Sequence, residues 1–577
     1  GPGARGRLLW WQSRLPLASP DTIAIVRVKS IDAFIKSVID LAGGFDPGKA
    51  PMMQQQANAM LMGLPGVDRT GPAALLVLDP KKFGDPAVGL FTLKDPAQFK
   101  TVKLAQVEVV GNIGLIAEDQ IALAQAAQMV KNAAVKTIPT GDMTGMVAAT
   151  VDVGGLLRRY KADIQGLLQI AKLQLGGGMR GMEPAPPNPT QTMALKALDY
   201  LVKGINEVEK QAGLVQVEAT LSKDLIKVTS FFEATPGSDF ARFLAKNRVP
   251  ANRAVANYLP RGAWMTSIAS YDPASYAEAY VGMLRIGCDI LGLKKTEADA
   301  INKALEDWLK NLTGLQAGAG VGTKDGGYGG VGLYGMKDRA AARRHTKALV
   351  ALTGTGTVGN FLKKYGITAA LKEKHREHLG VPIDQVEVAF DLDKLLGAIP
   401  MPIPPDARPM MKQQLNQMLK MSYGHSDKIV GELAYGSKLM VMAYGPSVQD
   451  TMNQQVALIK AGGADGIGNV GWYKTALNAH PRRRLTAGHL SLFRYLETLT
   501  TMMAKATPDA AMVMGMFPKR SELPKDEVPI TLSARVEGNK CVMDVLVPVK
   551  PIRDIADAVK KKMGGMMPPP EKGLDDF

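Results

Sequence analysis

Two histidines, His375 and His378, are the residues of this 577-residue chain that come closest to a metal-site pattern. On a helix, positions three apart lie on the same face, and the imidazole nitrogen is a common zinc ligand. A zinc site needs further ligands, and the sequence offers none at a fixed spacing from this pair. Because residues 372–378 are strongly polar, we expect the solvated face of a helix here, with metal binding as the alternative.

Arginine-rich segments could bind an anion. Arg482, Arg483 and Arg484 form the densest basic run, and Arg343 with Arg344 forms a shorter one. A guanidinium group binds phosphate, sulfate or carboxylate through paired hydrogen bonds. No aromatic residue is interspersed in the longer run, so stacking on single-stranded nucleic acid is not expected. A solvated loop is the simpler interpretation of this run.

Methionine-rich segments suggest contact with something apolar. The sequence holds 30 methionines, and residues 51–61 and 409–419 are alike, with eight of eleven positions identical. Methionine fills cores, adapts to varied hydrophobic partners and can bind Cu(I) through its thioether. We expect core packing as the ordinary role and a hydrophobic ligand surface as the first alternative, ahead of copper. The candidate residues of that surface are Met52, Met53, Met60, Met410, Met411 and Met418.

Two glycine patterns, residues 354–359 and 466–471, have the GxGxxG spacing of dinucleotide-binding loops. Such a loop must follow a strand and open a helix, so that the phosphates lie at the helix N-terminus. Here a predicted helix precedes each pattern, over residues 338–352 and 447–459. We therefore expect helix ends and turns at both patterns, and we predict no cofactor.

Nucleophilic and acid–base catalysis have no recognisable residues in this sequence. No serine lies in a complete nucleophile elbow, and no two carboxylates are marked out as an acid–base pair. The two cysteines, Cys288 and Cys541, exclude a disulfide scaffold and a cysteine-based zinc cluster. They either form one disulfide or are buried free thiols, and we favour the second interpretation. We therefore predict no catalytic residue.

The elements that would position these residues follow a recurring order. Alternating apolar residues on both sides of a tight turn predict β-hairpins, and a helix is predicted after each hairpin. A strand and one or two helices are predicted before each hairpin. The predicted hairpins span residues 106–117, 214–232, 316–334, 430–443 and 528–547, and the helices after them span 120–130, 238–245, 338–352, 447–459 and 552–563.

This order predicts an α+β fold of about five degenerate repeats, each strand–helix(–helix)–β-hairpin–helix. Because the strands of a hairpin are antiparallel, we expect a mainly antiparallel sheet with helices packed on one face. Such repeats could share one long sheet or form separate domains, and the sequence leaves this open. The predicted units are residues 21–144, 145–250, 251–380, 381–480 and 481–563, between an N-terminal segment, 1–20, and a disordered tail, 564–577.

Charge and hydropathy narrow the classes of function. Lys plus Arg number 70 and Asp plus Glu number 54, so the net charge is 70 − 54 = +16, and it is spread along the chain. A spread positive charge favours weak attraction to acidic partners, whereas nucleic-acid binding needs a clustered stripe. No apolar run reaches the roughly 18 residues of a membrane span. We expect an acidic polysaccharide, a lipid headgroup or another protein as partner, no nucleic acid and no transmembrane segment.

Residues 19–28, SPDTIAIVRV, and residues 109–118, VVGNIGLIAE, resemble segments of large secreted or periplasmic proteins of uncharacterised function from planctomycete-type bacteria. The resemblance implies an extracytoplasmic location, with an export signal missing from this sequence, and no known catalytic residues. Because repeats build extended surfaces, we expect a non-enzymatic binding or structural protein with an extended basic surface. The first alternative is a carrier of a hydrophobic ligand in a methionine-rich cavity, and the second is a hydrolase or metal-dependent enzyme.

Overall fold

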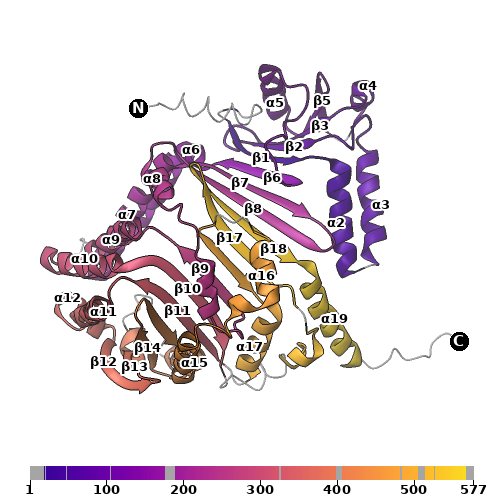
Figure 1. Ribbon diagram of the computed structural model, residues 1–577. Coiled ribbons are helices and arrows are strands. Elements are labelled where there is room, and N and C mark those ends of the chain that lie inside the picture. The colour runs from indigo at the N-terminus through magenta and orange to yellow at the C-terminus, as the bar shows by residue number, and fades with distance from the viewer. Residues whose placement is uncertain are drawn as a thin grey trace. The chain divides into compact units, whose positions relative to one another are not determined.

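Figure 1 shows the computed structural model of the chain, which describes residues 19–566 with short gaps. The gaps are residues 20, 47, 104, 176–188, 324–326, 398–403, 405, 481–483, 505–513 and 526. The predicted α+β class is confirmed, since 48% helix is combined with 28% strand in a large antiparallel sheet. Most of the expected N-terminal segment and of the expected disordered tail lies outside the described residues.

The chain folds into two compact units. Unit 1 comprises Gly1–Asp163, Ile205–Arg242 and Glu537–Val549, and unit 2 comprises Ile164–Gly204, Phe243–Val536 and Lys550–Phe577. The divisions between the units fall inside the second and fifth of the repeats expected from the sequence.

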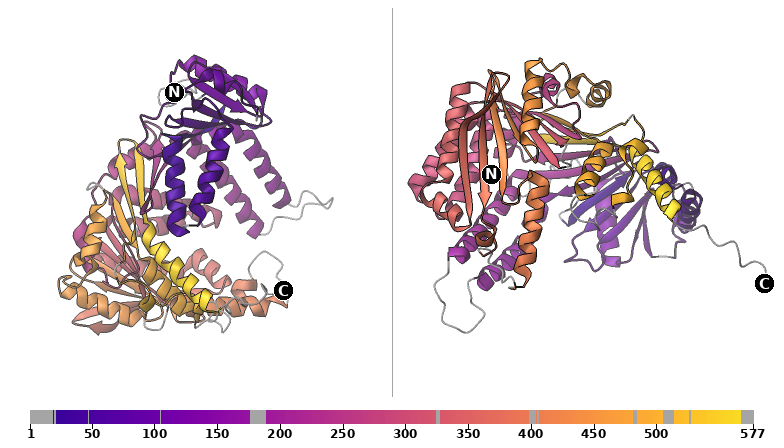
Figure 2. Two further views of the ribbon diagram at one scale, coloured as in Figure 1. Left: turned by 90° about the vertical axis from the view of Figure 1, so that its right-hand side faces the viewer. Right: turned by 90° about the horizontal axis from the view of Figure 1, so that it is seen from below.

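In unit 1 the strands pair antiparallel in the order β4–β5–β3–β2–β1–β6–β7–β8–β18. The strands are β1 (Thr22–Val28), β2 (Ala73–Leu78), β3 (Ala87–Thr92), β4 (Gln106–Val110), β5 (Ile113–Ala117), β6 (Val147–Asp152), β7 (Ala212–Leu221), β8 (Leu225–Ala234) and β18 (Lys540–Pro548). The helices of its first segment are α2 (Ile31–Phe45), α3 (Lys49–Met62), α4 (Pro96–Phe99) and α5 (Gln120–Ala133). Figure 2 shows α2 and α3 as a pair lying side by side.

Helix α5 packs against one face of the unit 1 sheet at strands β3, β4 and β5. The carboxylate of Asp119 accepts hydrogen bonds from the backbone N–H groups of Ile121 and Ala122, which caps the start of the helix. Its buried residues pack against Ile25 of β1 and Leu76 of β2 in one hydrophobic core. The face that carries Ile25 and Leu76 is therefore the packed face at this end of the sheet.

Helices α6 (Val153–Leu175), α7 (Pro189–Gln211) and α8 (Asp239–Lys246) run from one unit into the other along the chain. In unit 2 the strands pair antiparallel in the order β12–β13–β14–β15–β11–β10–β9–β16–β17. The strands are β9 (Met265–Ser270), β10 (Leu312–Gly322), β11 (Tyr328–Met336), β12 (Ile367–His378), β13 (Val381–Phe390), β14 (Lys428–Tyr435), β15 (Leu439–Tyr444), β16 (Thr486–Leu490) and β17 (Ile530–Glu537).

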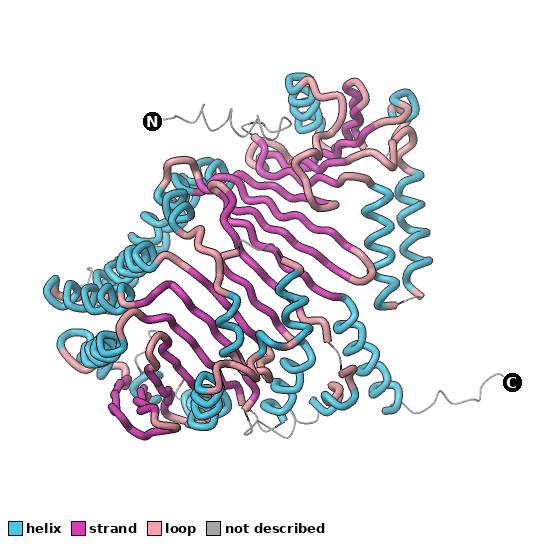
Figure 3. Tube along the Cα trace, viewed as in Figure 1, coloured by secondary structure: helices cyan, strands magenta, loops and turns pink. Residues whose placement is uncertain are grey.

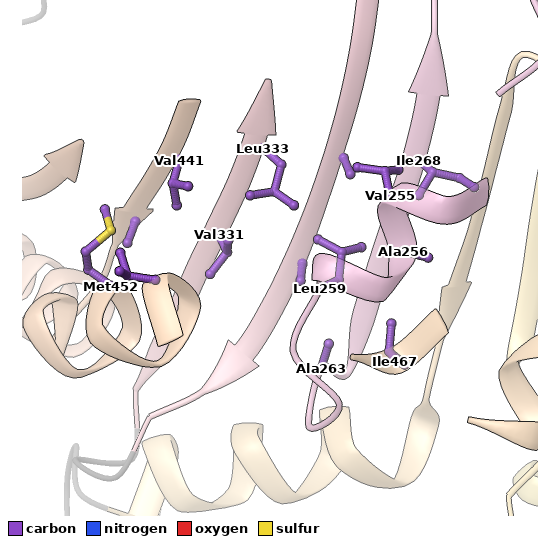
Figure 4. Close-up of a cluster of buried hydrophobic side chains, with 14 of the residues drawn as sticks. Val255, Ala256, Leu259, Ala263, Ile268, Val331, Leu333, Val441, Met452 and Ile467 are labelled. Carbon is purple, nitrogen blue, oxygen red and sulfur yellow. The ribbon is translucent and has the colours of Figure 1, made fainter. Parts of the chain in front are cut away.

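The helices of unit 2 connect these strands and cover the sheet. They are η1 (Arg253–Tyr258), α9 (Pro273–Ile290), α10 (Lys295–Lys310), α11 (Arg339–Thr353), α12 (Gly356–Lys364), α13 (Leu392–Gly397), α14 (Ala407–Tyr423), α15 (Val448–Lys460), η2 (Ile467–Asn469), α16 (Gly471–Asn478), α17 (Leu492–Ala504), η3 (Arg520–Glu522) and α19 (Val549–Met566). Figure 4 shows the main core, in which Val331, Leu333 and Val441 of the sheet lie near Met452 of α15 and Leu259 beside η1.

The predicted hairpins are present as β4–β5, β7–β8, β10–β11 and β14–β15, and β17 and β18 flank the turn at Gly538. Helices α5, α8, α11, α15 and α19 follow them in the predicted places. The structure departs from the predicted order in two places, because the antiparallel pairs β2–β3 and β12–β13 were not predicted. Figure 3 shows the helices and strands of the chain by colour. That these segments are copies of one repeat stays a prediction.

The predicted helix at residues 372–378 is wrong, because this segment is the end of strand β12. Strand β12 pairs with β13 through a register interruption between Lys372 and Arg376. Its exposed polar residues resemble those of a helix surface, and an edge strand exposes side chains in the same way.

Candidate functional site

The face of the unit 1 sheet opposite helix α5 is apolar across six neighbouring strands. The register places Val26, Ala149, Val217, Ser230 and Met543 in one row across β1, β6, β7, β8 and β18. Side chains two positions apart along a strand share a face. We define the apolar face as every second residue of β2 from Ala73 to Val77, β1 from Ala24 to Val28, β6 from Val147 to Val151, β7 from Val215 to Leu221, β8 from Ile226 to Phe232, and β18 from Cys541 to Val547.

The apolar face carries no charge and is partly exposed to solvent, although helix α2 contacts strand β7. Its members are hydrocarbon or thioether side chains, apart from Ser230 and the thiol of Cys541. Only Ala73 is buried, whereas Leu75, Val217 and Met543 are 41%, 40% and 49% exposed. Because burial of apolar surface is worth about 25 cal/mol per Å², a contiguous exposed patch of this kind is typical of a binding surface.

The opposite face of the same sheet holds charged residues, several of which are buried, whereas Lys227 on that face is exposed. Arg27 is 1% exposed and donates to both carboxylate oxygens of Asp142, at 2.6 and 2.9 Å. Glu218 accepts hydrogen bonds from the backbone N–H groups of Thr144 and Gly145, at 2.8 and 2.6 Å. Partial burial raises the pKa of Asp142, but the hydrogen bonds and charge of Arg27 outweigh it and hold that pKa below its usual value.

Unit 1 therefore reverses the usual distribution of polarity across a sheet. An antiparallel sheet with one solvated face ordinarily turns its polar residues to water. Here Glu218, Thr229 and Asp544 lie in one buried row, and the hydroxyl of Thr229 donates to Asp544 at 2.8 Å. On the apolar face of the same strands, Val217 and Met543 are 40% and 49% exposed, which favours a binding role for that face.

Unit 2 carries a second uncharged row on one face of its sheet. The row runs through Leu532, Gly488, Ser267, Gly318, Gly332 and Met442. In the neighbouring row Met265 and Tyr444 are 43% and 41% exposed. A Cβ atom added to Gly330 would lie 2.1 Å from Cζ of Tyr444. The tyrosine ring therefore lies over a glycine, which keeps this part of the face flat.

The candidate methionines are on the surface of two helices. Met52 and Met60 of α3 are 52% and 76% exposed, and Met410 and Met418 of α14 are 57% and 49% exposed. Met53 and Met411 are partly exposed. Core packing, the role that we expected for these six, is therefore wrong for the four exposed residues, whereas Met53 and Met411 are partly buried. Helix α3 belongs to unit 1 and α14 to unit 2.

The candidate arginines differ in their surroundings. Arg482 and Arg483 lie outside the described residues. Arg343 donates to both carboxylate oxygens of the buried Asp384, one of them at 2.9 Å. Its guanidinium group is therefore already paired with a carboxylate. Arg344 is exposed.

Arg484 is 1% exposed, and its Nη1 donates to the carbonyl oxygen of Leu477 at 2.5 Å. Its Nε and Nη2 atoms have no hydrogen-bond partner among the described residues. Desolvation lowers the pKa of this guanidinium to about 10, and the nearby positive charge of Arg253 contributes to the shift. It is therefore a buried structural cation and not part of an exposed basic loop.

The candidate metal ligands His375 and His378 lie on strand β12, which is not a helix, so the argument from helical spacing does not apply to them. Among the described residues, no three His, Cys, Asp or Glu side chains are grouped in a way that could hold a metal ion. Cys288 and Cys541 are free thiols, as we favoured. Burial raises the pKa of both thiols, which makes them poor nucleophiles.

Each glycine pattern follows a helix, as predicted, since α11 ends at Thr353 and α15 ends at Lys460. In the second pattern the glycines allow two backbones to approach. A Cβ atom on Gly466 would lie 1.6 Å from the carbonyl oxygen of Asn257, and one on Gly468 would lie 2.3 Å from Oδ1 of Asn257. The pattern joins η2 to η1 and has the geometry of a packing contact.

The sequence analysis missed the apolar face, although a signal for it was present. Strands β1, β6, β7 and β8 alternate small or β-branched apolar residues with other residues, for example VQVEATL at 215–221. Such alternation predicts a strand with two different faces. It does not reveal that the apolar face is the open one, because that depends on where α5 and the loop at residues 139–145 pack.

Comparisons with known proteins add no relative: no protein-family model, no curated protein and no solved structure matches this chain. Within the described residues, no helix is both long enough and apolar enough to cross a membrane.

Proposed function

We propose that the protein is a non-enzymatic binding protein for an apolar, lipid-like ligand, which lies on the apolar face of unit 1. The observation that carries this proposal is an uncharged, partly exposed face across six strands whose other face buries Arg27, Glu218 and Asp544. Of the functions expected from the sequence, this is the carrier of a hydrophobic ligand, but the binding surface is a sheet face and not a methionine-rich cavity.

The chemistry of the face favours binding over catalysis. A long hydrocarbon chain needs no directional hydrogen bonds, and its affinity grows with the apolar area that it covers. The Ser230 hydroxyl is half-buried, and the pKa of the Cys541 thiol is raised by burial. Neither is set beside a base on this face that would activate it. The face therefore supports holding a ligand rather than transforming it.

The extracytoplasmic location implied by the resemblance is part of the proposal, and cell fractionation tests it. The acidic partner expected from the net charge of +16 is a second candidate. It gains support from cations gathered around one cavity of unit 2, described in the next subsection.

A charge placed in the middle of the apolar face tests the proposed function. Val217 of β7 is 40% exposed at the centre of the face, and Val217→Glu would oblige a bound hydrocarbon to desolvate a carboxylate. We expect Val217→Glu to weaken binding of the neutral dye Nile red by about tenfold or more, measured by fluorescence titration. We also expect a long-chain alcohol to displace the dye from the unaltered protein.

The matched control is Thr220→Glu. Thr220 is an exposed residue of the same strand on the opposite face. This variant adds the same charge to the same strand and should bind the dye as the unaltered protein does. Equal binding by all three proteins, with circular dichroism showing each to be folded, would contradict the proposed function.

A further inference from the structure

A cavity of about 550 Å³ lies in unit 2, where the turn between β14 and β15 meets the end of helix α15. Small-molecule sites typically enclose about 300–1,000 Å³. The apolar wall includes Ala434, Val441 and Val456, which are at most 4% exposed and belong to the main core of unit 2. The wall is therefore fixed by close packing and needs no reorganisation to receive a ligand.

Three cations and no carboxylate are found among the described residues that line this cavity. Arg339 is the first residue of α11, Lys438 lies in the turn between β14 and β15, and Lys460 is the last residue of α15. All three side chains are exposed. The three come from separate elements, so their convergence is a property of the fold.

These three cations lack the partners that neighbouring cations have. Within the described part of the chain, no carboxylate lies within ion-pair distance of Arg339, Lys438 or Lys460. By contrast, Lys347 of the same helix α11 contacts Glu373 at 2.5 Å. Like charges gathered without a counterion repel one another, and a bound anion relieves that repulsion.

The ligand chemistry follows from the combination of rim and wall. An arginine fork binds two oxygens of one anion, and the lysines add point charges beside it. Three positive charges match a dianion better than a single carboxylate. The core residues behind them provide apolar contact for a small hydrocarbon or aromatic group.

We infer that this cavity binds a phosphate monoester that carries a small apolar group. The phosphate would be held by Arg339, Lys438 and Lys460, and the apolar group would contact Val456 and Ile459. The inference goes beyond the proposed function, because it concerns another unit, another ligand charge and another set of residues.

Isothermal titration calorimetry with phenyl phosphate tests the inference. We expect saturable binding that weakens about tenfold or more in the double variant Lys438→Gln/Lys460→Gln, and that weakens as the salt concentration rises. Inorganic phosphate lacks the apolar group and benzyl alcohol lacks the charge, so each should bind more weakly than phenyl phosphate. Benzoate binding as tightly as phenyl phosphate would overturn the assignment to phosphate.

The matched control is Lys474→Gln. Lys474 is an exposed lysine of α16 in the same unit and does not line the cavity. The control should bind phenyl phosphate as the unaltered protein does. An equal loss in the control would show that net charge alone attracts the anion, and the absence of saturable binding to the unaltered protein would also refute the inference. Since Nile red binding to unit 1 should be unchanged in the lysine variants, the two proposals can fail separately.

Discussion

A buried histidine of unit 2 shows how far packing can shift the pKa of a single side chain. His489 of β16 is 1% exposed, its Nδ1 lies 2.6 Å from the hydroxyl of Thr266, and the rings of Trp472 and Tyr473 pack against it. Burial lowers the pKa of His489 to about 3, and the positive charge of Arg494 contributes to the shift. The histidine is therefore neutral in the folded protein over the ordinary pH range.

This shift predicts a pH dependence of stability. In the unfolded chain His489 becomes protonated below about pH 6.5, whereas in the folded protein it becomes protonated only below about pH 3. Because the unfolded state binds the extra proton, the free energy of unfolding should fall as pH drops below 6.5, with a slope of at most about 1.4 kcal/mol per pH unit from this residue. Urea unfolding of the unaltered protein and of His489→Asn, at pH 7 and pH 5, measures the difference.

We expect the unaltered protein to lose about 2 kcal/mol more than His489→Asn does between these pH values. The control is His375→Asn, since His375 is exposed on β12. Its pH dependence should equal that of the unaltered protein. The same pH dependence in His489→Asn and in the unaltered protein would contradict the predicted role of His489.

At the scale of elements, hairpins with a clear turn signal were predictable, whereas the β2–β3 pair and the edge strand β12 were not. The hairpin at residues 106–117 combines alternating apolar residues with a Gly111-Asn112 turn, and the structure has β4 and β5 within the same bounds. Strand β12 ends in KEKHREH, a sequence whose polarity suits a helix surface equally well. Only its pairing with β13, a long-range contact, makes it a strand.

The candidate surfaces illustrate the same limit. The six methionines were identifiable by composition, but their exposure depends on which side of α3 faces α2 and which side of α14 faces the sheet. The alternation in β7 was visible, but the open side of that strand is set by packing with distant segments. Local patterns therefore predicted the elements, and tertiary contacts decided which of their faces is free.

The second glycine pattern yields a prediction at this scale. A Cβ atom on Gly466 would lie 1.6 Å from the backbone oxygen of Asn257, which cannot move without shifting η1. Gly471, the last glycine of the same pattern, has no atom within 4 Å of an added Cβ. We expect Gly466→Ala to lower the free energy of unfolding by about 3 kcal/mol or more through overpacking, and Gly471→Ala to change it by less than about 1 kcal/mol.

Denaturant unfolding of both variants measures this difference. A nucleotide-binding role would make both glycines important for binding and not for stability, which is the opposite pattern. Equal stability of Gly466→Ala and the unaltered protein would show that η1 does not pack on this turn as described.

At the scale of the molecule, the two units share a pattern of connections. The order β5–β3–β2–β1–β6–β7 in unit 1 corresponds to β15–β11–β10–β9–β16–β17 in unit 2. In both, the first strand leads through a helix pair to a hairpin, and α5 or α15 returns the chain to the other side of the first strand. Unit 2 adds β12 and β13 at its edge. This correspondence leads to the hypothesis that the two units arose by duplication of one ancestral unit.

The sheet of unit 1 includes strand β18, which lies far along the chain from its other strands. Strand β18 pairs with β8 along nine residues, and the Thr229–Asp544 hydrogen bond joins positions 315 apart in sequence. The outer strand of the apolar face therefore arrives last during synthesis, and β8 is an edge strand until then. Long-range pairing of this kind is slow to form, because the cost of closing the intervening loop comes first.

A proline in β18 should consequently destabilise a segment that lies far away in sequence. Val545 pairs with Val228, and Val545→Pro removes a ladder hydrogen bond and disfavours the strand. We expect amide hydrogen exchange of residues 225–234 to accelerate by about tenfold or more, with residues 428–444 of unit 2 unchanged. Val545→Thr, which keeps the backbone donor and the β-branched shape, should exchange like the unaltered protein. If β8 kept its protection in Val545→Pro, then β18 would not be what completes the unit, and the apolar face would end at β8.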